Sequence, residues 1–340
     1  MERKGIIAAG NMLVDHVHQI VQWPERGWLA EITHSERSTG GAPLNVLLTL
    51  AKADGTALPA FTAGAHIDLH LGEDLVRPYS LCGDPCELNH YQLGVLKDSQ
   101  SKGGSLAVHG LQEGDEIQVS EPRNLFALDE KASFSLLIGG GIGITPMLAM
   151  AAELMAAGRA FSLHYCARSR AQAAFVAQLT ASAYAPQVHL HFSDEQRINL
   201  DAVLCDVPAG THVYVCGPTR LMDAVSEQAT AQGYAPEQIH QECFSAEVET
   251  GGQPFEVVAV ASGITVQVAA NQTIVEALAL AGLKVCVSCK QGICGSCLTD
   301  VLEGEPDHRD HYLTDEEKAD GDQILLCCSR AKSARLIIDL

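Results

Sequence analysis

The 340-residue chain has few positive charges, few aromatic side chains and no long apolar stretch. Lysine and arginine number 22 against 42 aspartates and glutamates, so the formal net charge is −20. A surface this acidic repels phosphate backbones and anionic lipid headgroups, which argues against nucleic-acid or membrane binding as the main role. The charge would suit a partner with a basic face, or it would simply keep the protein in solution.

No apolar run approaches the roughly 18 residues that a membrane-spanning helix needs. The first twenty residues carry Asp15, His16 and His18 where a secretory signal would need an apolar core. We therefore expect a cytoplasmic protein in a reducing compartment. There, metal ligation or burial explains the twelve cysteines better than disulfide bonds do.

Four cysteines near the C-terminal end follow a metal-binding pattern, CxxxxCxxC with a distant fourth member: Cys289, Cys294, Cys297 and Cys327. This spacing is typical of plant-type [2Fe–2S] sites. Gly292 and Gly295 lie inside the loop, where they permit positive φ angles and let N–H groups approach the sulfurs. The pattern predicts these four cysteines as cluster ligands. Zinc is the second candidate metal, although its usual pairs of CxxC motifs are absent, and Cys328 is a second candidate for the fourth ligand.

The segments around the cysteine loop fit a ferredoxin. Residues 255–260 and 264–268 alternate apolar and polar side chains, which predicts a hairpin, and residues 273–282 predict a short helix that ends at glycine.

A nucleotide-binding pattern precedes this region. The apolar residues 134–138 predict a strand, the glycine-rich residues 139–143 a turn, and the next residues a helix with Thr145 as N-cap and Pro146 at its first position. Such an arrangement directs bare N–H groups and the helix dipole at a pyrophosphate. Further strands at 161–168, 188–192 and 211–215 predict a parallel sheet with ligands at its carboxyl ends. Cys216 falls at such an end, where it either packs or lies beside a nicotinamide.

The first third of the chain predicts a small barrel of short strands. Within it, Arg77, Tyr79 and Ser80 form an RxYS pattern, and the Gly103-Gly104-Ser105 turn opens a short helix, which is a second anion-binding arrangement.

Together these motifs resemble the phthalate dioxygenase reductase family, which includes the reductases of vanillate demethylase and carnitine monooxygenase, over about residues 53–340. The resemblance implies a multidomain fold: an antiparallel β-barrel at 53–128 that binds FMN, an α/β parallel-sheet domain at 129–245 that binds NADH, and a β-grasp ferredoxin domain at 254–340 with a [2Fe–2S] cluster.

The family's site residues carry over to matching positions. The resemblance assigns to FMN the residues Arg77, Tyr79, Ser80, Gly103, Gly104 and Ser105. It assigns to NADH the residues Gly140, Gly141, Gly143, Thr145, Pro146, Gly217 and Pro218. Arg168, at the end of the predicted strand 161–168, is a further candidate for cofactor binding. Cys216 and Phe244 would shape the place where nicotinamide meets flavin. Arg168 and Arg170 leave NADPH open as an alternative, because an arginine pair could recognise a 2′-phosphate.

The resemblance implies an NADH-dependent reductase component of a two-component oxygenase. FMN would take a hydride, and single electrons would pass through the cluster to a partner oxygenase, expected to be of the Rieske type.

Residues 1–52 depart from the family and resemble the N-terminus of ribokinase-type sugar kinases, where Asp15, Gly41 and Asn45 would touch a sugar. Residues 31–37 and 44–50 are candidates for the missing barrel strands. If neither docked, the barrel would keep an open edge. The alternative function is then a ferredoxin-like electron carrier with an impaired flavin domain, and a kinase-derived sugar sensor is a more distant third.

Overall fold

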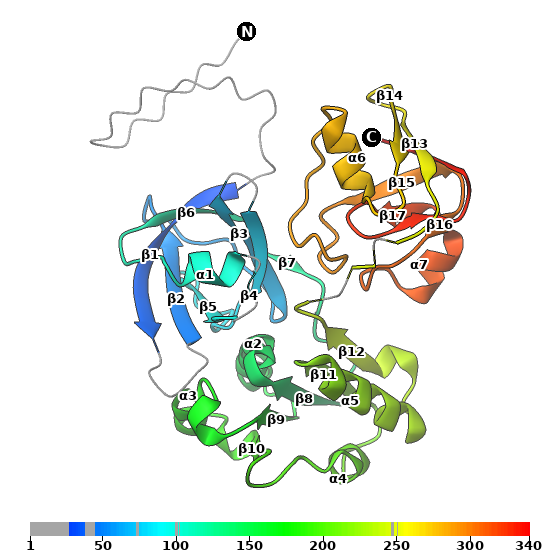
Figure 1. The fold of residues 1–340 in the computed structure, drawn as a ribbon. Coiled ribbons are helices and arrows are strands. Elements are labelled where there is room, and N and C mark those ends of the chain that lie inside the picture. The colour runs from blue at the N-terminus through cyan, green and yellow to red at the C-terminus, as the bar shows by residue number, and fades with distance from the viewer. Residues whose placement is uncertain are drawn as a thin grey trace.

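The computed structural model describes residues 27–37, 45–72, 75–98, 101, 103–245, 248–249 and 251–340. These residues form three main sheets that follow one another along the chain, together with a two-stranded one (Figure 1). Among the described residues, no helix combines the length and the apolar character that crossing a membrane requires.

The first sheet is an antiparallel barrel in the strand order β4-β3-β6-β1-β2-β5. Its strands are β1 (Gly27–Arg37), β2 (Asn45–Lys52), β3 (Ala65–Gly72), β4 (Leu75–Ser80), β5 (Tyr91–Leu96) and β6 (Glu116–Ser120), with β7 (Arg123–Asn124) beside β3 and the helix α1 (Gly104–Val108). A bridge between Leu81 and Leu93 joins the two ends of this order. The barrel therefore closes on itself.

Strands β1 and β2 come from residues 1–52, the segment for which the sequence predicted a departure from the family resemblance. Along β2 every second side chain is buried, namely Val46, Leu48 and Leu50, which is the pattern of a strand with one face in the core. β1 pairs with both β2 and β6, and β2 pairs with β5, so the expectation that residues 31–37 and 44–50 supply strands is confirmed. The expected barrel boundary at residue 53 does not coincide with the edge of this sheet, because backbone pairing extends it to Gly27.

The proposed sugar contacts find no support in the fold. Asn45 begins β2, where it pairs with Leu96 of β5. Asp15 and Gly41 lie outside the described residues.

The second sheet is parallel throughout, in the order β10-β9-β8-β11-β12. Its strands are β8 (Phe134–Gly140), β9 (Phe161–Ala167), β10 (Val188–Phe192), β11 (Thr211–Cys216) and β12 (Ile239–Glu242). The chain winds outward from β8 in one direction and from β11 in the other. The carboxyl ends of β8 and β11 therefore flank a topological switch point, which is where open parallel sheets bind ligands.

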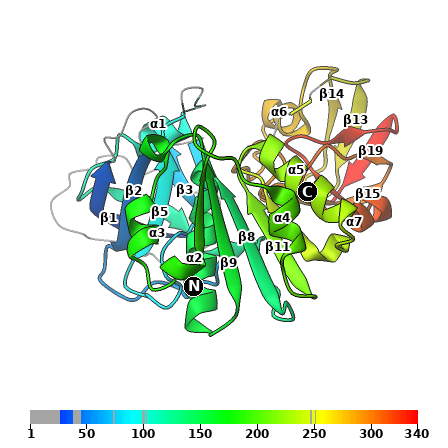
Figure 2. The same ribbon diagram turned by 90° about the horizontal axis from the view of Figure 1, so that it is seen from below.

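Helices cover both faces of the parallel sheet (Figure 2). They are α2 (Ile144–Ala156), α3 (Val176–Ala181), α4 (Leu200–Cys205) and α5 (Thr219–Ala231), with 3-10 turns at η1 (Gly141–Gly143), η2 (Arg170–Gln172), η3 (Ala185–Gln187) and η4 (Pro236–Gln238). Leu137 of β8 packs in the core on the α2 side, whereas Leu136 and Ile138 pack in the core on the α5 side. Barrel residues such as Phe126 share the α2 core, so these two domains pack directly on each other.

The prediction that Thr145 is an N-cap is wrong. The 3-10 turn η1 leads straight into α2, so the cap position falls on Gly143 and the helix begins at Ile144. Thr145 lies within the first turn, and its hydroxyl donates to the Ile142 carbonyl at 2.9 Å. Pro146 is then the third helical residue, where a missing N–H still costs no helical hydrogen bond.

The third sheet has the order β14-β13-β19-β15-β17. Its region contains β13 (Phe255–Ala259), β14 (Ile264–Val268), α6 (Ile274–Leu280), β15 (Leu298–Glu303), β16 (Pro306–Asp307), α7 (Asp315–Asp320), β17 (Gln323–Leu325), β18 (Arg330–Ala331) and β19 (Arg335–Ile338). The expected hairpin and helix are confirmed. A capping box between Thr273 and Glu276 starts α6, and Gly282 follows it at φ 87°.

A stack of histidines lies at the edge of the parallel sheet. The ring centroid of His164 in β9 is 4.6 Å from that of His189 in β10, and its Nδ1 is 3.0 Å from Nε2 of His191. Burial, followed by the two neighbouring histidines, lowers the pKa of His164 to about 3. Its ring is therefore neutral in the folded protein at neutral pH.

We expect acid to weaken the protein through this stack. The folded pKa of His164 lies below its unfolded value of about 6.5, so the unfolded chain binds the proton first. The stabilisation is present above about pH 6.5 and is lost as the pH falls from there toward about 3. When the pH falls from about 7.5 to about 5.5, the Tm of the parent protein should drop by about 2–4 °C more than the Tm of the His164→Phe variant does. Calorimetry at the two pH values measures both drops. Equal losses in both proteins would contradict this expectation.

Candidate functional site

The four predicted cluster ligands gather at one point from two segments. Three come from the loop between α6 and β15, and the fourth follows β17: Cys289, Cys294, Cys297 and Cys327. Each side chain is at most 7% exposed. The Cys289 thiol lies within hydrogen-bonding range of the Cys294 and Cys327 thiols, and the Cys327 thiol also reaches Cys297.

Two glycines let the loop curl around this point. Gly292 and Gly295 both have φ of 72°. A Cβ atom at Gly292 would lie 2.5 Å from Sγ of Cys328, and one at Gly295 would lie 2.4 Å from the Tyr312 ring. The N–H of Gln291 donates to Sγ of Cys289 at 3.3 Å. Four buried thiols with a backbone donor to sulfur are a donor set that fits a [2Fe–2S] cluster.

The arrangement of thiols favours Cys327 over Cys328 as the fourth ligand. Cys327 reaches two other thiols of the set, Cys289 and Cys297. Cys328 directs its thiol toward the Leu325 carbonyl, 3.9 Å away, and packs beneath Gly292. In the described part of the chain, no three His, Cys, Asp or Glu side chains surround a single ion position. A [2Fe–2S] cluster needs no such group, because each iron takes only two protein ligands.

The two predicted flavin motifs meet on the barrel. Arg77, Tyr79 and Ser80 lie on β4, and Gly103, at φ 99°, is the N-cap of α1. A Cβ atom at Gly104 would lie 2.6 Å from Cγ of Arg77. Only glycine therefore allows this turn to lie directly against the arginine. Ser105, on the same turn, accepts a hydrogen bond from the N–H of Asp98 at 3.2 Å.

The far end of β4 touches the parallel-sheet domain. The Ser80 hydroxyl donates to Oε2 of Glu242, the last residue of β12, at 3.1 Å. Burial raises the pKa of Glu242 to about 8, against the opposing effect of this hydrogen bond. Cys216 pairs with Glu242 across the ladder and is fully buried, which raises the pKa of its thiol. Phe244 follows two residues later and is 38% exposed.

The family resemblance also covers the pattern Glu242-Cys243-Phe244, but it implies a role only for the aromatic side chain. The contact of Glu242 with Ser80 joins positions 162 residues apart, so the pattern alone does not predict it. The Tyr79 side chain faces the barrel core, and burial raises its pKa to about 12.

The two loops at the switch point interlock through glycines. A Cβ atom at Gly143 would lie 2.3 Å from the Cys216 carbonyl oxygen, and one at Gly217 would lie 2.9 Å from Cα of Gly140. Gly140 also adjoins Pro218, the N-cap residue of α5. The backbone approach is so close that larger residues do not fit.

The remaining predicted nucleotide residues surround this contact. Gly141, at φ 56°, is exposed, and a Cβ atom there would meet no other atom within 4 Å, whereas Thr145 and Pro146 are buried at the start of α2. Arg168 is exposed just after β9. The Arg170 guanidinium lies 4.7 Å from the centroid of the Phe192 ring, in a cation–π contact.

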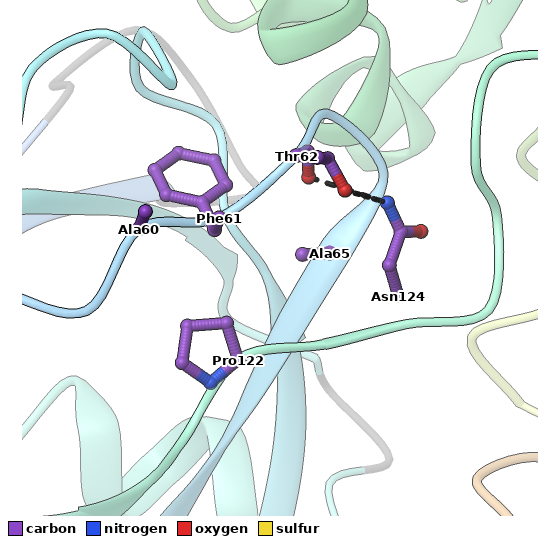
Figure 3. Close-up of a pocket in the computed structure, with 6 residues that line it drawn as sticks. All are labelled: Ala60, Phe61, Thr62, Ala65, Pro122 and Asn124. Carbon is purple, nitrogen blue, oxygen red and sulfur yellow. Dashed lines mark hydrogen bonds between the residues drawn. The ribbon is translucent and has the colours of Figure 1, made fainter. Parts of the chain in front are cut away.

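A shallow hollow of about 230 Å³ lies elsewhere on the barrel, lined by Ala60, Phe61, Thr62, Ala65, Pro122 and Asn124 (Figure 3). The Asn124 amide donates to the Thr62 hydroxyl at 2.6 Å across it. None of its lining residues belongs to the predicted site, and it is smaller than the roughly 300–1,000 Å³ of typical ligand pockets.

Comparisons with known proteins agree with this geometry. Residues 258–332 match the family model described as a 2Fe-2S iron-sulfur cluster binding domain, and residues 116–239 match the N-terminal domain of the dimethylamine monooxygenase subunit DmmA-like family. The chain is 50% identical over 301 residues to a vanillate O-demethylase oxidoreductase of Pseudomonas sp. (strain HR199), covering 87% of this chain and 95% of the relative. It is 41% identical over 298 residues to the carnitine monooxygenase reductase subunit of Escherichia coli K12, covering 86% and 92%.

Solved structures give the same result. The chain resembles phthalate dioxygenase reductase, described as a modular structure for electron transfer from pyridine nucleotides to [2Fe–2S], with a TM-score of 0.70 and 37% identity over 92% of this chain and 98% of that one. An intact type IV self-sufficient cytochrome P450 monooxygenase matches with a TM-score of 0.82 and 39% identity, over 95% of this chain and 43% of that one.

We expect Gly104→Ala to impair flavin binding, because the added methyl group would displace Arg77 from the turn. Gly83→Ala is the matched control in the same barrel, since its Cβ atom would meet Gln92 at an ordinary 3.4 Å. The flavin-to-protein ratio after gel filtration should fall at least about fivefold in the first variant, which corresponds to about 1 kcal/mol of lost affinity, and should stay unchanged in the second. Equal flavin contents would rule out the proposed contact.

Proposed function

This chain belongs to the phthalate dioxygenase reductase family, and from that premise we propose that it is the NADH-dependent reductase component of a two-component oxygenase. One observation carries the proposal: two residues of the predicted flavin strand touch the other two functional regions. Ser80 bonds to Glu242 of the parallel-sheet domain, and the Arg77 guanidinium donates to the Ser288 carbonyl at 3.4 Å, one residue before the cluster ligand Cys289. β4 thus lies between the predicted nucleotide site and the predicted cluster site.

The cofactors are NADH, FMN and a [2Fe–2S] cluster. When bound, FMN supplies the conversion between a two-electron hydride donor and a one-electron acceptor. Arg77 and the Gly103-Gly104-Ser105 turn would hold the flavin phosphate side, as a cation and a set of backbone N–H groups suit an anion. The interlocked glycine loops at Gly140, Gly143 and Gly217 would receive the dinucleotide.

Two residues at the domain junction would position the reacting groups. Cys216 is a small, uncharged and fully buried side chain at the carboxyl end of β11. Glu242 stays close to its neutral form near neutral pH, because burial raises its pKa to about 8. Both therefore keep water and charge away from the place where a nicotinamide would meet the flavin.

The choice of NADH over NADPH rests on the family relationship. The Arg170 guanidinium lies over the Phe192 ring. Arg168 remains exposed beside it.

The partner is proposed to be a Rieske-type oxygenase, and the protein is proposed to work in the cytoplasm. A relative of Ectopseudomonas mendocina that is 39% identical over 290 residues carries the name heme-dependent oxidative N-demethylase beta subunit, so a haem oxygenase is the second candidate partner. In an assay with purified oxygenases of both classes, NADH consumption should be coupled to product formation only with the class to which the natural partner belongs. Coupling to a haem demethylase but to no Rieske oxygenase would overturn the Rieske assignment.

We expect Cys294→Ser to remove iron and to lower NADH-dependent cytochrome c reduction by about tenfold or more, since one cluster ligand is lost. Reduction of ferricyanide, which accepts electrons from flavin directly, should persist. The exposed Cys286→Ser is the matched control and should keep both activities. Unchanged iron content in the Cys294 variant would refute the cluster assignment.

A second pair of variants separates the two candidates for the fourth ligand. Cys327→Ser should lose most of its iron and acid-labile sulfide, whereas Cys328→Ser should retain both, because only the first thiol reaches Cys289 and Cys297. The reverse pattern would identify Cys328 as the ligand.

A further inference from the structure

The cluster loop is tied to the flavin barrel through two serines that adjoin predicted ligands. The Ser288 hydroxyl, next to Cys289, donates to Oδ1 of Asp68 at 2.7 Å. Arg123 donates from its guanidinium to the Ser296 hydroxyl at 3.2 Å, and Ser296 lies between two ligands. The two contacts therefore reach both ends of the ligand loop, from positions 220 and 173 residues away in the chain.

The barrel side of this contact is held rigidly. Asp68 lies in β3, is 7% exposed, and accepts a second hydrogen bond from Arg123 in an ion pair. Arg123 lies in β7, whose backbone pairs with β3 at His66. The Asp68 N–H donates to the Ser120 hydroxyl at 2.9 Å. Both charged side chains thus extend from neighbouring strands with little freedom to move.

The connection between the last two domains gives no other reason for this placement. β12 ends at Glu242 and β13 begins at Phe255, so a short segment joins the ferredoxin domain to the parallel sheet. The orientation of the cluster toward the flavin strand therefore depends on non-covalent contacts such as those of Asp68 and Arg123.

We propose that Asp68 and Arg123 are positioning residues for internal electron transfer, which hold the cluster loop against the flavin barrel through Ser288 and Ser296. The inference rests on the proposed function and deepens it. When both groups are bound, the step that these residues would serve is the transfer of one electron from flavin to cluster, which forms and breaks no covalent bond. Neither Asp68 nor Arg123 is oxidised or reduced.

Arg123 also places a positive charge close to the cluster. The hydroxyl of Ser296, which it contacts, lies 3.3 Å from Sγ of Cys294. Reduction adds a negative charge to the cluster, which a nearby cation stabilises and a nearby anion opposes. Replacing Asp68 by asparagine should therefore raise the cluster potential, and replacing Arg123 by methionine should lower it.

The test uses the holoprotein with Asp68→Asn, which removes the negative charge of the acceptor and its ion pair with Arg123, and with Ser288→Ala, which removes the hydroxyl donor. Each variant should reduce cytochrome c with NADH about tenfold more slowly than the parent, while ferricyanide reduction stays within about twofold, because a lost buried hydrogen bond to a charged group weakens docking. Hydrogen exchange of residues 286–298 should become faster. The double variant should be no slower than the slower single one.

Matched controls separate docking from general damage. Glu256→Gln breaks a carboxylate–arginine pair with Arg335 within the ferredoxin domain, 3.2 Å long, and should leave all three readouts unchanged. Ser288→Thr keeps the hydroxyl and should restore the rate that Ser288→Ala loses. If Asp68→Asn loses flavin, the serine pair decides the question, since it leaves the barrel side chains intact.

Unchanged cytochrome c reduction and hydrogen exchange in both single variants would overturn the proposal, as would equal losses in Ser288→Ala and Ser288→Thr. Failure of the underlying function is distinguishable, because the parent protein would then reduce no cytochrome c with NADH at all.

Discussion

The architecture depends on close approach between parts that fold around separate cores. Electron transfer requires that the redox groups lie close together. Each group nevertheless has its own domain: the barrel for flavin, the parallel sheet for the nucleotide and the ferredoxin domain for the cluster. β4 meets this requirement because its residues contact both neighbouring domains, through Ser80 at its end and Arg77 in its middle. The glycines at 104, 143 and 217 then remove the side chains that would keep the backbones apart.

Much of the fold was predictable from local patterns. The cysteine spacing, the strand–turn–helix at the nucleotide loop and the alternation in β2 are properties of neighbouring residues, and the structure agrees with them. One error was also local: the N-cap of α2 falls on Gly143 because a 3-10 turn precedes the helix. The strands expected at residues 31–37 and 44–50 are present, and through them the first sheet begins before residue 53.

The contacts between domains could not be predicted from the sequence. The bond from Ser80 to Glu242 and the bond from Ser288 to Asp68 join residues 162 and 220 positions apart, and no periodicity records such pairs. The raised pKa of Glu242 likewise follows from burial that only the packed domains create. Motifs specify residue types at fixed spacings, so the sequence could propose candidate site residues. The contact partners of those residues occur singly and belong to no such motif.

The first two barrel strands have a consequence for how such proteins change over time. β1 and β2 are held by backbone pairing and by alternate apolar side chains, and these demands can be met by many unrelated sequences. Residues 27–37 and 45–52 can therefore change in sequence without altering the contacts of β4, as long as the apolar alternation and the backbone pairing are kept. These two strands tolerate more sequence change than β4, whose Arg77 and Ser80 each contact one particular residue of another domain.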